Sequence, residues 1–239
     1  MGNAYTGERF RGEGPGAQTR DGSSVELYRR LPYFGEVEFL EPWIIGPRLL
    51  ELGCGVGRLT KHFLMRGFEV TAVDNSPEML EFEPRDAVTV CSNIEDLALD
   101  VRFDSAILAS NLINIPSSSQ RSAILESCQR HLRRGGALLF ERYDPNWLDA
   151  AVVGAAGELG EVHVHIDCVA RYPDHLEMSL RFRAGAEEWL HHFAAVSLND
   201  GQIHAALAQA GFETPKWINR RWGRAIKNDD AQLGRYVSP

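Results

Sequence analysis

The sequence predicts an α/β fold with a doubly wound, mostly parallel sheet and an inserted antiparallel β lid in the C-terminal half. Short apolar segments alternate with amphipathic helical patterns between residues 48 and 144. The first apolar segment runs directly into a glycine-rich turn. After residue 160 the pattern changes to longer segments separated by turn residues. The length of 239 residues suits one large domain.

The N-terminal part is polar before it becomes helical. Residues 1–24 are rich in glycine, which predicts a flexible leader or a lid that becomes ordered on binding. Helical patterns follow at residues 25–31 and 37–40, with a break at Pro32 and an end near Pro42. We therefore expect a single domain over residues 25–239.

The alternating region predicts five strands and three helices. The long third helix ends at Gly135, and Ser76 caps the second one with Pro77 in its first turn. The expected strands are 48–52, 68–73, 87–91, 103–108 and 137–141, and the expected helices are 58–65, 76–80 and 117–134.

The second half predicts an antiparallel addition and a closing segment. Three strands are expected at 162–171, 176–183 and 188–197, followed by a helix at 200–210 and closing strands at 212–218 and 222–226.

Composition and charge narrow the class of protein. Lys+Arg 25 against Asp+Glu 33 gives a net charge of -8, which repels phosphate backbones and favours a small-molecule partner over nucleic acid. No apolar stretch approaches the roughly 18 residues of a membrane span, and the N-terminus lacks the apolar core of a signal peptide. The four cysteines form no C-x-x-C pair and predict reduced thiols in a cytoplasmic protein.

The glycine-rich turn carries the main chemical signal. Glu51-x-Gly53-x-Gly55-x-Gly57 follows a strand and begins a helix. Glycines allow a tight turn and a close approach of the backbone to a ligand, and the helix N-terminus offers free N–H groups. Asp74 ends the next strand, where a carboxylate can accept hydrogen bonds from a ribose diol. The third glycine comes one residue earlier than in the G-x-G-x-x-G pattern of dinucleotide-binding folds.

This segment resembles the class I (Rossmann-like) S-adenosylmethionine-dependent methyltransferases of the small-molecule type, from about Leu49 to Asp144. The resemblance implies a seven-stranded sheet with one antiparallel strand, and S-adenosylmethionine as the cofactor. It divides the domain into a cofactor-binding core (48–144), a substrate-covering insertion with strands (145–197), and a C-terminal helix with closing strands (198–239).

The resemblance also implies cofactor-binding residues. Gly53, Gly55 and Gly57 correspond to the loop beneath the methionine part, and Asp74 to the ribose-binding acid. The remaining positions flank the ribose and adenine, follow the fourth strand near the methyl group, or cap the cofactor as N-terminal aromatics: Asn75, Met79, Asn93, Ile94, Ala109, Ser110, Tyr28 and Tyr33. Plain packing is the alternative for Met79, Ile94 and the two tyrosines.

The acceptor side is less defined. His163 and His165 share one face of an expected strand and are candidates for a general base, with a solvent-facing polar surface as the alternative. The same face carries Asp167, so these side chains could also bind a metal, but we assign no metal. Arg142 and Tyr143 end the fifth strand, where ligands of open α/β sheets bind. His191 and His192 point to opposite faces, so at most one of them enters a pocket.

The sequence therefore predicts an enzyme that transfers a methyl group to nitrogen or oxygen of a small molecule by in-line displacement. Two alternatives stay open. One is an NAD(P)-dependent oxidoreductase that uses the same glycine turn and Asp74. The other is a cofactor-holding binding module without methylation activity.

Overall fold

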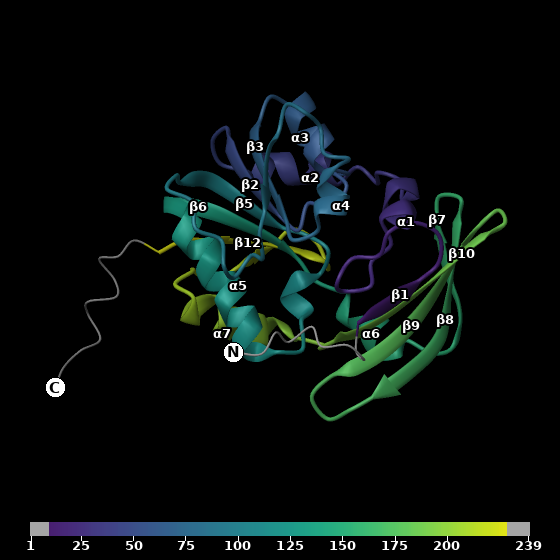
Figure 1. Ribbon diagram of the computed structural model, residues 1–239. Coiled ribbons are helices and arrows are strands. Elements are labelled where there is room, and N and C mark those ends of the chain that lie inside the picture. The colour runs from purple at the N-terminus through teal and green to yellow at the C-terminus, as the bar shows by residue number, and fades with distance from the viewer. Residues whose placement is uncertain (1–9, 229–239) are drawn as a thin grey trace.

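The computed structural model describes residues 10–228. Its centre is a seven-stranded sheet in the order β11-β12-β6-β5-β2-β3-β4, which we call the core sheet (Figure 1). Strands β2 to β6 are parallel, and β12 is antiparallel to both β6 and β11. The predicted sheet with one antiparallel strand is confirmed. Its strands are β2 (Arg48–Leu52), β3 (Glu69–Asp74), β4 (Val88–Cys91), β5 (Phe103–Leu108), β6 (Leu132–Glu141), β11 (Lys216–Trp217) and β12 (Trp222–Ile226).

Apolar side chains fill the space on both faces of the core sheet. Leu50 and Leu52 belong to a buried cluster with residues of α5 and α7, whereas Leu49 belongs to a second cluster with residues of α2 and α3. This two-sided burial explains why the strands read as continuous apolar runs. The helices are α1 (Val25–Arg30), α2 (Glu36–Leu40), α3 (Thr60–Met65), α4 (Pro77–Leu80), α5 (Ser118–His131), α6 (Pro145–Ala150) and α7 (Asp200–Gln209), with 3-10 turns η1 (Glu41–Trp43) and η2 (Leu112–Asn114).

A second, antiparallel sheet, which we call the lid sheet, has the order β1-β10-β9-β8-β7. The three predicted strands are present with small shifts at their ends, and β1 and β7 join them at the two edges. Its strands are β1 (Arg11–Glu13), β7 (Gly154–Leu159), β8 (Val162–Arg171), β9 (Leu176–Ala184) and β10 (Glu187–Ala195).

The N-terminal segment differs from the flexible leader that its glycines predict. Residues 11–13 pair with β10, and Ser24 caps α1 by accepting a hydrogen bond from the Leu27 amide. Figure 1 shows this segment and α1 between the core sheet and the lid sheet. Leu27 packs there against the lid residue Trp189. Long-range pairing therefore orders residues 10–24, while residues 1–9 of the predicted leader lie outside the described part.

The described residues 10–228 contain no helix that is long and apolar enough to cross a membrane.

Candidate functional site

The glycine turn after β2 is held against β3. The backbone N–H groups of Gly53 and Cys54 both donate to the Val73 carbonyl, at 2.8 and 3.1 Å. Gly55 has φ +61°, and a Cβ placed on it would have no protein atom within 4 Å. At Gly57, by contrast, a Cβ would lie 2.8 Å from Pro84. Gly57 is therefore needed for packing, whereas Gly55 leaves open space next to the backbone for a ligand.

Asp74 lies at the end of β3, facing this turn. One carboxylate oxygen accepts from the Gly55 amide at 2.9 Å, and the other accepts from the Ser76 amide at 3.0 Å. Burial raises the pKa of Asp74, while these two hydrogen bonds oppose that rise. A carboxylate has about four acceptor positions. Asp74 can therefore hold the loop and still accept hydrogen bonds from a sugar diol.

The predicted adenine-side residues meet at the ends of β3 and β4. Asn75 donates to the side-chain oxygen of Asn93 at 3.2 Å, and Asn93 donates to Asp96 at 2.9 Å. Met79 and Ile94 are buried, at 3% and 9% exposure, and Ile94 belongs to the core cluster. The two amides thus form a polar pair at the ends of β3 and β4.

Two buried carboxyl groups lie beneath the glycine turn. The Thr60 hydroxyl is 2.8 Å from Glu51 and 3.2 Å from Glu83. A hydroxyl has one proton to donate, so the second contact requires a protonated carboxyl group. Burial raises the pKa of Glu51 to about 8 and that of Glu83 to about 7. The floor of the turn is therefore less acidic than its residue types suggest.

The turn after β5 is strained and held by β6. Ser110 and Asn111 both have φ +57°, which is uncommon for residues other than glycine. The Ser110 amide donates to Glu141 at 2.9 Å, and Arg221 donates to the other oxygen of Glu141 at 2.6 Å. Ala109, before the turn, is buried. Glu141, which the sequence only marked as a strand end, fixes this turn.

Tyr143 lies where β6 leaves the core sheet and meets the lid. Its ring stacks on Trp147, with ring centroids 5.7 Å apart, and on Phe193 of β10, at 6.1 Å. Its backbone N–H donates to Asn114 at 3.0 Å. Burial raises the pKa of the Tyr143 hydroxyl, and the Asn111 side chain lies near enough to lower it. The contact with Asn111 places Tyr143 beside the strained turn.

Tyr28 of α1 is within electrostatic reach of both Asp74 and Tyr143. Burial raises the pKa of its hydroxyl, and the nearby carboxylates of Asp21 and Asp74 raise it further. The Ser23 side chain acts in the opposite direction and lowers the pKa of Tyr28, and Tyr28 in turn raises the pKa of Tyr143. The predicted N-terminal aromatic therefore reaches the site, together with Asp21, which the sequence did not single out.

The hydroxyl and the ring of Tyr33, a predicted site residue, both make contacts within the fold. The Tyr33 hydroxyl contacts Glu38 and accepts from the Val37 amide, and its ring stacks on His62 at 3.5 Å. It packs α2 against α3 instead of offering a free hydroxyl to a cofactor.

Arg142 ties β6 to the C-terminal elements. Its guanidinium donates to Asp200 at 2.6 Å and to the Arg220 carbonyl at 3.0 Å. It also lies 3.7 Å from the ring centre of Trp217. With 7% of its side chain exposed, Arg142 holds α7 and β11 in place, and its guanidinium is committed to these contacts.

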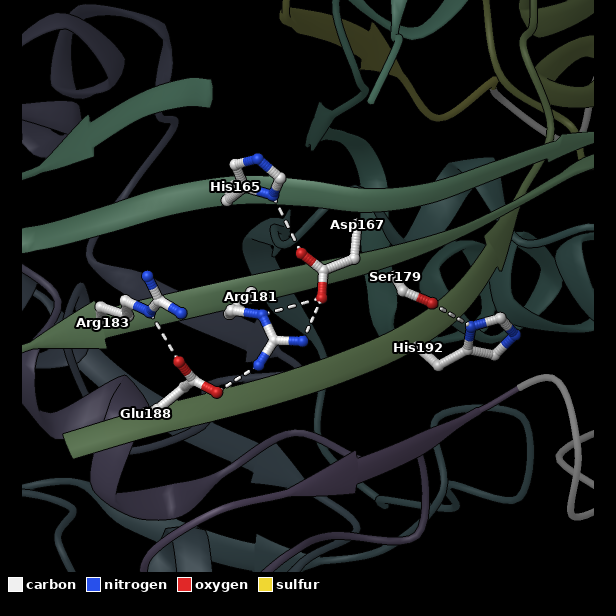
Figure 2. A network of polar contacts seen from close by, with 7 residues as sticks. All are labelled: His165, Asp167, Ser179, Arg181, Arg183, Glu188 and His192. Atoms are coloured by element: carbon white, nitrogen blue, oxygen red, sulfur yellow. Dashed lines mark hydrogen bonds and ion pairs between the residues drawn. The ribbon is translucent and has the colours of Figure 1, made fainter. Parts of the chain in front are cut away.

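His163 and His165 do not enter the site. Val162 and Ile166, which alternate with them on β8, pack toward α1 and Phe193. The histidines therefore point to the opposite face, with 68% and 49% of their side chains exposed. His163 contacts Glu158, and Figure 2 shows His165 in a surface network of ion pairs. The network contains Asp167, Arg181, Arg183 and Glu188. Strand alternation identified their shared face, but that face is turned to solvent.

Comparisons with known proteins agree with this geometry. Residues 49–136 match the family model of the methyltransferase domain. The chain is 32% identical over 123 residues to the ubiquinone biosynthesis O-methyltransferase of Xanthomonas oryzae pv. oryzae (strain PXO99A), which covers 47% of this chain and 50% of that protein. The chain thus spans about half the length of the curated relatives it matches.

Solved structures match over more of the chain. An S-adenosylmethionine-dependent methyltransferase from Clostridium acetobutylicum ATCC 824 has a TM-score of 0.67 at 18% identity, covering 84% of this chain and 94% of that one. The sugar N-methyltransferase KedS8 from Streptoalloteichus sp ATCC 53650 has a TM-score of 0.69 at 17% identity, covering 87% and 94%. At these identities the likeness concerns the fold.

Proposed function

Because residues 49–136 form a methyltransferase domain in a chain with the class I, Rossmann-like methyltransferase fold, we propose that this protein transfers the methyl group of S-adenosylmethionine to a nitrogen or oxygen of a small molecule. The arrangement of Gly55 and Asp74 is the observation that carries the proposal. Open space adjoins the Gly55 backbone, and the carboxylate that binds its amide keeps acceptor capacity for a ribose.

The fit to this cofactor rests on chemistry that the site already holds. Gly53, Gly55 and Gly57 would lie beneath the methionine part, and Asp74 would accept from the ribose hydroxyls. The polar pair of Asn75 and Asn93 would lie near the adenine, as would the buried Met79 and Ile94. Ala109 and Ser110 would lie near the methyl group, at the strained turn.

The acceptor would lie between the core sheet and the lid sheet. Tyr143, Trp147 and Phe193 offer stacked aromatic surface, and Tyr28 and Asp21 add polar groups. Aromatic walls with a few polar groups suit a small organic molecule. The net charge of -8 supports the same choice against nucleic acid. The relative named ubiquinone biosynthesis O-methyltransferase and the solved structure named a sugar N-methyltransferase are both consistent with a small-molecule acceptor.

The reaction needs alignment more than acid or base groups. When bound, S-adenosylmethionine supplies a methyl group on a positively charged sulfur, and the thioether leaves without a proton. The glycine turn and Asp74 would fix the cofactor, while the aromatic residues orient the acceptor and exclude water. Such positioning contributes up to roughly 7–11 kcal/mol in well-oriented systems.

Calorimetry and label transfer test the proposal together. We expect saturable binding of S-adenosylmethionine and S-adenosylhomocysteine and none of NAD. We also expect transfer of tritium from methyl-labelled cofactor to a component of a small-molecule metabolite extract. Preferential binding of NAD would support the oxidoreductase alternative. Cofactor binding without any transferred label would support the binding module. Asp74→Ala serves as the control variant and should weaken cofactor binding and lower label transfer at a limiting cofactor concentration.

We also propose that the protein is located in the cytoplasm. All four cysteines are free thiols, and two of them, Cys54 and Cys128, are buried. Unpaired thiols are typical of a reducing compartment, which supports a cytoplasmic protein. Cell fractionation with an antibody against the chain would test this.

A further inference from the structure

His191 lies on the face of the lid sheet that is turned toward the core sheet. It occupies β10 between Trp189 and Phe193, and residues two apart on a strand share a face. Trp189, 1% exposed, packs against Leu27 of α1. Phe193 stacks on Tyr143, and its ring centre lies 5.5 Å from that of His191. His191 is therefore part of the aromatic wall that faces the acceptor.

The neighbouring residue His192 provides an internal comparison. It lies on the outer face of the lid sheet, where its Nδ1 is 2.8 Å from the Ser179 hydroxyl (Figure 2). His191 and His192 are thus adjacent histidines on one strand, but His191 lies on the inner face of the lid sheet and His192 on the outer face.

A hydrogen bond fixes the tautomer of His191. Its Nε2 is 3.1 Å from the backbone carbonyl oxygen of Asp21. A carbonyl oxygen can only accept, so Nε2 carries the hydrogen. The Nδ1 atom of the neutral ring is then the one with a lone pair. No residue in the described range 10–228 hydrogen-bonds Nδ1.

The surroundings keep this ring neutral. Burial lowers the pKa of His191, and His192 lowers it further, while the Asp21 carboxylate and carbonyl act in the opposite direction. The residues paired with His191 on the neighbouring strands, Gly12 on β1 and Leu180 on β9, carry no charge. A neutral imidazole with an uncommitted nitrogen is able to accept a proton.

The loop that holds His191 also reaches the cofactor side. The Asp21 carboxylate accepts from the Thr19 hydroxyl and from the Ser23 amide, which fixes the loop. The same carboxylate acts electrostatically on Tyr28 and on the ribose acid Asp74. Asp21 therefore contacts His191 through its carbonyl oxygen, and its carboxylate acts electrostatically on Tyr28 and Asp74.

From this placement we propose that His191, through Nδ1, is the general base that takes the proton from the acceptor nitrogen or oxygen. This rests on the proposed function. The acceptor atom forms a bond to the methyl carbon as the carbon–sulfur bond breaks, and the bonding pair stays on sulfur as a neutral thioether. The acceptor proton moves to Nδ1, and the imidazolium later releases it to water. The Asp21 carbonyl stabilises the imidazolium by accepting from Nε2.

Nitrogen NMR of histidine-labelled protein tests the starting state of the base. The signal that disappears in His191→Gln assigns the residue. We expect the Nε2–H tautomer, neutral at pH 7, with and without S-adenosylhomocysteine. A ring protonated at Nδ1, or one charged at pH 7, would overturn the assignment of His191. A protein that binds no S-adenosylhomocysteine in the same tubes would instead overturn the proposed function.

Turnover tests the role itself, with catechol and glucosamine as oxygen and nitrogen acceptor probes. Gln can still donate to the Asp21 carbonyl but cannot accept the proton as imidazole does. We expect His191→Gln to lower kcat by about 100-fold or more and to remove the acidic limb of the pH profile, with cofactor affinity changed less than twofold. His192→Gln should keep kcat within twofold. An unchanged acidic limb in His191→Gln would refute the base, because the ionisation of the probe is common to all variants.

Discussion

Replacing Gly55 by alanine distinguishes the role of this loop in cofactor binding from its role in folding stability. The backbone at Gly55 has φ +61°, and the added methyl group would meet no protein atom within 4 Å. The variant is therefore destabilised only by the conformational strain of an L-residue in this region of φ/ψ space. This strain lowers the free energy of unfolding by about 1–2 kcal/mol. For a domain of this size that corresponds to a fall in Tm of about 2–8 °C.

The same methyl group occupies the space that the cofactor would need. Forcing an extra methyl into a filled contact typically costs about 1–3 kcal/mol, which corresponds to a loss of affinity of about 5- to 150-fold. Isothermal titration with S-adenosylhomocysteine measures this loss, and thermal denaturation measures the strain.

Gly67→Ala is the matched control for this variant. Gly67 follows α3, has φ +83°, and also has no protein atom within 4 Å of an added Cβ. It should lose a similar amount of stability and keep the affinity of the unmodified chain. If Gly55→Ala binds S-adenosylhomocysteine within twofold of the unmodified protein, the ligand does not lie against this loop, and the reasoning is wrong.

Three further variants address the rest of the site. Asp74→Ala should weaken S-adenosylhomocysteine binding by about 1–3 kcal/mol in calorimetry, because hydrogen bonds to a charged group are lost; unchanged affinity would contradict the ribose assignment. The raised pKa of Glu83, about 7, means that the folded state keeps a proton that the unfolded state releases above pH 4.5, so the free energy of unfolding should fall as pH rises from about 4.5 to 7. In urea titrations at pH 5 and pH 8, Glu83→Gln should reduce this fall by on the order of 1–3 kcal/mol, while the exposed Glu81→Gln leaves it unchanged; a slope that Glu83→Gln does not alter would exclude this carboxyl group as its source. Replacing His163 and His165 together by Gln should leave kcat within twofold in the label-transfer assay, and a large fall would mean that the lid's outer face takes part in turnover.

The core sheet and the glycine turn could be predicted because their signals are local. Leu49 and Leu50 are buried on opposite faces of one strand, and that burial requires a continuous apolar run. Gly53, Gly55 and Gly57 all have positive φ in the turn that directly follows β2, so their spacing is a local signal of that turn. Asp74 was identifiable because it ends the next strand of the same pattern.

The lid and the acceptor side depend on contacts distant in sequence. Strand β7 has the sequence Gly-Ala-Ala-Gly-Glu-Leu, which carries no apolar alternation. The role of Arg142 follows from Asp200, 58 positions away, which a local pattern cannot show. Alternation placed His163 and His165 on one face correctly, but it could not say which face turns inward. Trp189-x-His191-x-Phe193 was the usable signal, because the apolar neighbours of His191 mark the inner face.

The pairing of β1 with β10 makes the lid sheet depend on two segments that are far apart in the sequence. Residues 11–13 emerge from the ribosome about 180 positions before their partner strand, so during synthesis they wait without a sheet to join. A chain interrupted before β10 would contain the whole glycine turn and Asp74, yet no partner for the loop at Asp21. The glycine turn and Asp74 are therefore synthesised before β10, whereas the lid sheet can form in full only after β10 has been made.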